Sequence, residues 1–65
     1  MSAEESLQRA EELLAKLEEA RADLERLSES EDVDGAIEAL TRLSGLAKEV
    51  EAELQRARRE ADAAP

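Results

Sequence analysis

The stretch VDGAIEALTRLSGLAKEVEAELQRA, residues 33–57, decides the fold class of this chain. Its apolar residues recur in alternating steps of three and four, the heptad pattern of a helix whose apolar seam packs on another helix. The pattern predicts one helix over about 33–61, followed by a frayed C-terminus. The predicted seam of this helix consists of Val33, Ala36, Leu40, Leu43, Ala47, Val50 and Leu54.

The first half of the chain carries a second heptad seam, with Ser6 in its one polar gap. Neither Gly nor Pro interrupts residues 1–34, so the pattern predicts one helix over about 2–28. The best-defined seam residues of this helix are Leu13, Leu17, Ala20, Leu24 and Leu27.

Residues 29–32, between the two seams, are predicted to form a turn. Ser and Asp favour caps and turns over helix interiors, so Asp32 or Ser30 should cap the second helix. Folding the chain back here pairs seam positions whose residue numbers sum to about 60. The prediction is therefore an all-α fold, in which residues 1–65 form a single antiparallel two-helix hairpin with a coiled-coil seam.

Composition excludes several classes of function. The chain has 65 residues, a formal net charge of −9, and no Cys, His, Phe, Trp or Tyr. Thiolate and imidazole catalysis and Cys/His zinc sites therefore have no residues to carry them. The negative charge opposes direct binding of nucleic acid, and no apolar run is long enough for a membrane span. We expect a cytoplasmic protein that is not an enzyme and has no catalytic residues, no cofactor, no metal and no membrane association.

Further apolar residues lie outside the predicted seam. They widen the apolar face of each helix toward the pattern of a helical bundle. Because so short a chain has a small core, we expect two hairpins to pair as a four-helix bundle in a homodimer, or one hairpin to dock on another helical protein. The predicted interface consists of Leu7, Leu14 and Ile37 on one flank and Ala39 and Leu46 on the other.

The stretch SEDVDGAI, residues 30–37, is similar to half of an EF-hand calcium loop, with oxygen-bearing side chains at loop positions 1, 3 and 5 and Gly at position 6. Thr41 stands at position 12, where such a loop needs a bidentate Glu. An acidic helix start, favoured by the helix dipole, accounts for the same residues.

Short fragments resemble the small subunit of bacterial exonuclease VII: LERLSES at 24–30, EAL at 38–40, GLA at 45–47 and LQRA at 54–57. The resemblance implies a non-catalytic helical subunit that wraps a larger nuclease subunit. The chain departs from that family where Asp32-Val33-Asp34 replaces its Leu-Pro-Leu entry to the second helix. The agreement of caps, seam and surface charge is also typical of an artificial, designed helical bundle with no natural function.

Overall fold

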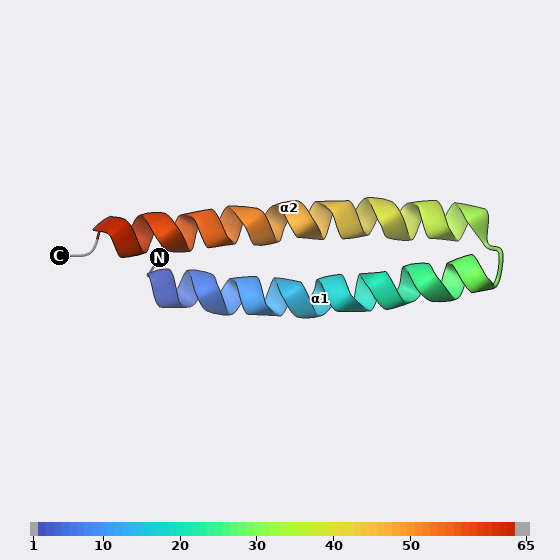
Figure 1. Ribbon diagram of the computed structural model, residues 1–65, viewed down its shortest axis with the longest axis horizontal. Helices are drawn as coiled ribbons and strands as arrows, with labels where there is room; N and C mark the ends of the chain where they lie inside the picture. The colour runs from blue at the N-terminus through green and yellow to red at the C-terminus, as the bar shows by residue number, and fades with distance from the viewer. Residues whose placement is uncertain (1, 64–65) are drawn as a thin grey trace.

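The computed structural model describes residues 2–63 and confirms an all-α helical hairpin. Helix α1 spans Ala3–Glu29 and helix α2 spans Val33–Ala63. The start of α1 and the end of α2 lie at one end of the hairpin, and the loop lies at the other (Figure 1). The helix runs on through residues 62–63, where fraying was expected, and residues 64–65 lie outside the described part of the chain.

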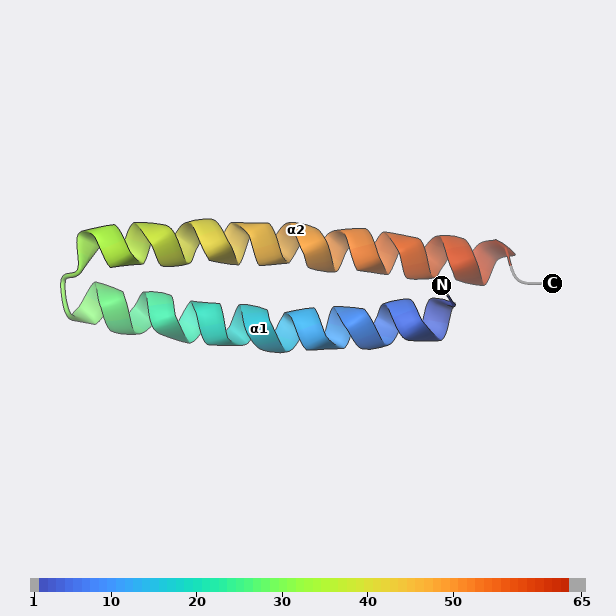
Figure 2. The same ribbon diagram turned by 180° about the vertical axis from the view of Figure 1, so that it is seen from behind.

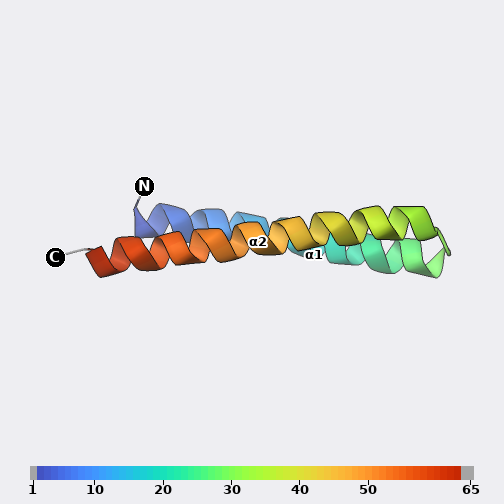
Figure 3. The same ribbon diagram turned by 90° about the horizontal axis from the view of Figure 1, so that it is seen from above.

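The hairpin is a long, thin rod with Cα extents of 53 × 14 × 12 Å. The two helices lie side by side along their whole shared length, as the views of its two broad faces show (Figures 1 and 2). Viewed from above, they cross at a shallow angle (Figure 3). Such a crossing is typical of helices that pack along a heptad seam.

Helix α1 begins with a side-chain cap. Ser2 has an extended backbone, and its Oγ accepts a hydrogen bond of 3.1 Å from the backbone N–H of Glu5. This bond satisfies one of the N–H groups that a helix start leaves without a partner. The acidic side chains of Glu4 and Glu5 in the first turn have the charge that the helix dipole favours there.

Helix α1 ends in a Schellman arrangement. The backbone N–H of Glu31 donates to the carbonyl of Ser28 at 3.1 Å, and that of Asp32 donates to the carbonyl of Leu27 at 2.9 Å. This pair of bonds requires a left-handed residue after the helix end, a position that Gly usually occupies. Here Glu31 occupies that position with a φ of 61°. Its Cβ makes this left-handed conformation sterically less favourable than it would be for Gly.

Helix α2 begins at a cap that the same loop supplies. The Oδ1 atom of Asp32 accepts a hydrogen bond of 2.9 Å from the backbone N–H of Gly35. Of the two predicted caps, the structure therefore selects Asp32, while Ser30 ends α1 and its Oγ donates to the carbonyl of Leu27 at 3.1 Å. A Cβ on residue 35 would come within 2.6 Å of Asp32 Oδ2, so Gly leaves room for the capping carboxylate.

The core between the helices is narrow and built mainly from small residues. Within residues 2–63, the buried apolar side chains are Ala10, Leu13, Ala20, Ala39, Val50 and Ala57. The buried polar side chains are Ser6 and Glu53. Other predicted seam residues are half-buried, namely Leu17, Leu24, Leu27, Ala36 and Leu43.

On α2 the predicted seam is wrong at every second position. Val33, Leu40, Ala47 and Leu54 are exposed, and Leu40 keeps 51% of its surface open to solvent. Their places toward α1 are taken by Ala39, Leu46 and Glu53, each one residue earlier in the chain. Residues one apart differ by about 100° around a helix, so α2 is rotated relative to the predicted orientation. The physical reason is that Ala39 and Leu46 stand next to Leu40 and Ala47 in the sequence, so α2 offers two overlapping apolar strips toward α1.

The register between the helices also differs from the prediction. The residue numbers of the interhelical ion pairs Arg9–Glu53 and Asp23–Arg42 sum to 62 and 65, where 60 was expected. The cause lies in the loop, because α1 continues to Glu29 and the chain reverses around Glu31.

Candidate interaction surface

One side of the seam, which we call the polar flank, is closed by ion pairs between the helices. It carries Arg9, Lys16 and Asp23 on α1 and Arg42, Glu49 and Arg56 on α2, at seven-residue spacing on each helix. The Nη2 atom of Arg42 donates to Oδ2 of Asp23 at 2.8 Å. Arg9 pairs across the hairpin as well, with Glu53 of α2.

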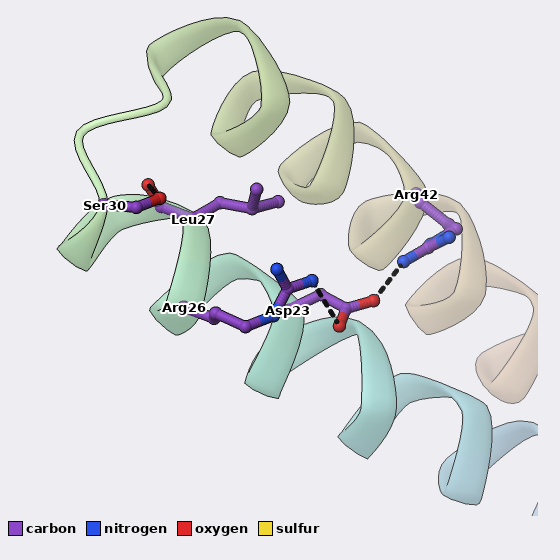
Figure 4. Close-up of polar contacts among 5 residues, drawn as sticks. All are labelled: Asp23, Arg26, Leu27, Ser30 and Arg42. Atoms are coloured by element: carbon purple, nitrogen blue, oxygen red, sulfur yellow. Dashed lines mark hydrogen bonds and ion pairs between the residues drawn. The ribbon is translucent and has the colours of Figure 1, made fainter.

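Asp23 lies between two arginines, and Figure 4 shows it reaching from α1 toward Arg42 on α2. Its other carboxylate oxygen accepts from Nη2 of Arg26, one turn along α1, at 3.3 Å. The three side chains are partly exposed, so each pair contributes at most about 1 kcal/mol to folding. The main effect of these ion pairs is on the orientation of the helices, because they hold one edge of α2 against one edge of α1.

Glu53 is a buried carboxylate at the other end of this flank, with 6% of its surface exposed. Its Oε1 accepts from Nε of Arg9 at 3.2 Å and from Nη1 of Arg56 at 2.9 Å. Within residues 2–63, no hydrogen-bond partner is in reach of Glu53 Oε2 or of the buried Ser6 Oγ. The sequence analysis did not identify Glu53 as a buried residue, because its neighbour Leu54 fits the apolar seam. The only sign of a polar stretch in the seam was Ser6, the one polar residue among the seam positions of the first helix.

The opposite side of the seam, which we call the apolar flank, is open. Helical periodicity places Leu7 and Leu14 across α1 from Arg9 and Lys16, and the ion pairs fix the polar flanks of both helices on one side. The corresponding residues of α2 therefore face the same way as Leu7 and Leu14. The exposed residues of the apolar flank are Leu7, Leu14, Val33, Leu40, Ala47 and Leu54, with Ile37 at its outer edge.

At the loop end, the apolar flank is hollowed into a groove of about 320 Å³. Leu24 and Leu27 of α1 form one wall, and Val33, Ile37 and Leu40 of α2 form the other. Val33 is 68% exposed and Ile37 is 58% exposed, the two highest values among the large apolar residues of the described chain. A groove that is lined by large apolar side chains is the kind of site in which an amphipathic helix docks.

The structure divides the predicted interface residues. Leu7, Leu14 and Ile37 are exposed and belong to the apolar flank. Ala39 is buried against α1 and Leu46 is half-buried, so neither lies on an open outer flank as predicted. The reason is the rotation of α2, which turns Ala39 and Leu46 inward and turns Leu40, Ala47 and Leu54 outward.

The residues considered for calcium binding do not form a loop beyond Asp32. Residues 33–41 are helical, and the carboxylate of Asp32 is engaged as the cap of α2. No group of three or more metal-ligating side chains occurs within residues 2–63.

Neither helix, over the residues that the structure describes, combines the length and apolar character that a bilayer crossing requires. Comparisons with protein-family models, with curated proteins and with solved structures gave no match to this chain.

Proposed function

We propose that the protein is a non-catalytic interaction module that self-associates through the apolar flank, forming a bundle of helices with a second copy. The observation that carries this proposal is the one-sided exposure of large apolar side chains. One flank is tied by ion pairs, while the other leaves four leucines, Val33 and Ile37 open to solvent. An apolar surface of this extent on a soluble chain marks an interaction site.

The thinness of the core supports association. Four of the six buried apolar residues in the described part of the chain are alanines, which contribute little apolar area. Chains of this length seldom reach more than about 3–5 kcal/mol of stability from one core, and this chain has no Cys for a disulfide. Burying an exposed Leu fully contributes roughly 1.5–3 kcal/mol, and a twofold interface uses each residue twice.

The proposal is tested by charge substitutions on the apolar flank. The double variant Leu14→Glu/Leu40→Glu should be monomeric in sedimentation equilibrium at concentrations where the wild-type chain is a dimer. The matched control is Ala22→Glu/Ala52→Glu, which introduces the same charges at exposed positions outside the apolar flank. The control should remain dimeric, and a wild-type chain that is monomeric and fully helical at micromolar concentration would refute the proposal.

A second candidate is an accessory helical subunit of a larger nucleic-acid enzyme complex, which the fragments similar to the exonuclease VII small subunit suggest. The observation in its favour is the groove at the loop end, because Leu24, Leu27 and Ile37 form an apolar surface on which a helix of another protein can pack. A chain that is monomeric and largely unfolded alone, and becomes helical only with a larger partner, would favour this candidate. Pull-down of one specific partner together with circular dichroism distinguishes the two candidates.

A further inference from the structure

The apolar flank of α2 has a pattern that matches itself when reversed. The flank residues Val33, Leu40, Ala47 and Leu54 recur at seven-residue spacing, Ala61 continues the same strip, and all five are exposed. Ala47 is central, a Leu stands seven residues away on either side, and a smaller apolar residue stands at each end. The strip therefore has the same order of large and small side chains in both directions.

A twofold interface requires this kind of pattern, because residue i of one copy contacts residue j of the other and residue j contacts residue i. An antiparallel pair of α2 helices centred on Ala47 sets Leu40 against Leu54 and Val33 against Ala61. Ala47 meets its own equivalent at the axis, where a small side chain lets two helices approach closely. The half-buried Leu43 and the buried Val50 beside the strip lie at nearly equal distances from the same centre.

We propose that the second copy docks with α2 antiparallel to α2, so that the two loops lie at opposite ends of the dimer. This inference rests on the proposed self-association and specifies its arrangement.

The alternative arrangement places the two loops at the same end and packs α2 of one copy on α1 of the other. With the register given by the ion pairs, Leu40 would then lie at the level of residues 22–25 of α1 and Val33 at the level of residues 29–32, and the nearest positions on the strip of Leu7 and Leu14 are Arg21 and Ser28. Both contacts set an apolar side chain against a polar one. The antiparallel α2 pairing sets the apolar residues of α2 against one another.

Charges on α1 are consistent with the same axis. The register places Ala47 at about the level of residues 15–18 of α1. In the proposed arrangement, Arg21 of one copy therefore lies near the level of Glu11 of the other, on opposite sides of the axis. Arg21 lies on the strip of Leu7 and Leu14, and within α1 its guanidinium pairs with Glu18 at 3.5 Å and with Glu25 at 3.3 Å. A contact with Glu11 of the other copy adds to these pairs and appears twice in the proposed dimer.

The available surface fits a stable dimer. The broad face of the hairpin measures 53 by 14 Å between Cα atoms, or about 740 Å² before side chains are added. A standard interface buries about 800 Å² on each partner. A second copy has a face of the same length and can cover the apolar flank from end to end.

The test uses the absence of Cys from the wild-type chain. Ala47→Cys places a thiol at the predicted twofold axis. The matched control is Ala52→Cys, because Ala52 is also exposed on α2 but lies about 140° away from Ala47 around the helix axis. Under mild oxidation, Ala47→Cys should form disulfide-linked dimers at least tenfold faster than Ala52→Cys. A spin label on Glu29→Cys leaves the interface unchanged. Glu29 lies about 13 residues from the axis level, so the labels should be about 40 Å apart.

The outcomes separate the arrangement from the proposed function. Rapid linkage at position 47 with labels about 40 Å apart supports the antiparallel dimer. If the labels of the dimer lie within about 20 Å of each other, which is about two helix spacings, the two loops lie at the same end. That result overturns the antiparallel arrangement but leaves the proposed self-association intact. A wild-type chain that sediments as a monomer overturns both.

Discussion

The Nε atom of Arg9 lies 3.2 Å from the Oε1 atom of Glu53, although 44 residues separate them in the chain. This contact joins the first turns of α1 to the last turns of α2, and it holds a buried carboxylate next to an exposed guanidinium. It also marks the side of the hairpin that is closed. The opposite side carries the surface proposed for association.

Glu53→Leu should leave the free energy of unfolding unchanged or raise it. The buried Glu53 has an Oε2 atom without a hydrogen-bond partner among residues 2–63, so its lost hydration is incompletely compensated. The Arg9 side chain is mostly exposed, so its guanidinium stays hydrated when the Glu53 carboxylate is removed. Urea unfolding compares this variant with Glu60→Leu, an exposed control expected to change stability by under about 0.5 kcal/mol. A loss above about 1 kcal/mol at Glu53 would contradict the expectation.

Leu13→Ala and Leu14→Ala should differ sharply, although the two residues are adjacent and identical. Leu13 is buried in the seam, so its truncation should cost about 2–5 kcal/mol at any protein concentration. Leu14 is 45% exposed on the apolar flank, so its truncation should cost little in dilute protein and more as the chain associates. Denaturant unfolding at two concentrations a hundredfold apart measures both effects. Equal costs in dilute protein would mean that the orientation of α1 is wrong.

Glu31→Gly should stabilise the hairpin by about 0.5–1 kcal/mol. Glu31 holds a φ of 61°, where a Cβ is sterically unfavourable and Gly is not. The control Glu29→Gly lies in the last residue of α1 and should be destabilising, since Gly is a poor helix former. Thermal unfolding followed by circular dichroism reports both changes. A lower melting temperature for Glu31→Gly would argue against a left-handed residue in the loop.

Gly45→Ala should raise stability by about 1 kcal/mol, whereas Gly35→Ala should gain little or nothing. Among the described atoms, a Cβ at residue 45 meets nothing within 4 Å, so the full difference in helix propensity is available. At residue 35, a Cβ would displace the Asp32 carboxylate and weaken a cap that contributes about 1 kcal/mol. Paired urea titrations of the two variants measure the difference. An equal gain at both positions would show that the cap contributes nothing.

Local patterns in the sequence were sufficient for the fold class and for the turn. Steps of three and four between apolar residues predicted two helices, and the observed bounds Ala3–Glu29 and Val33–Ala63 lie within about two residues of the predicted ones. The N-cap of α2 was narrowed to Asp32 or Ser30, because an N-cap depends on the residue itself and on the backbone three positions later, and the structure selects Asp32.

The orientation of α2 was decided only in the tertiary structure. Leu40 and Leu54 satisfy the heptad pattern, yet Ala39 and Glu53 occupy the seam. Both strips share Leu43 and Val50, so apolar periodicity within α2 does not distinguish them. Which of the two strips of α2 faces inward depends on the side chains of α1 that pack against it. Arg9 and Asp23 pair with groups on one edge of α2, and the small side chains of Ala10 and Ala20 let α2 approach α1 closely. Those are contacts between residues far apart in the chain, and a pattern within one helix does not contain them.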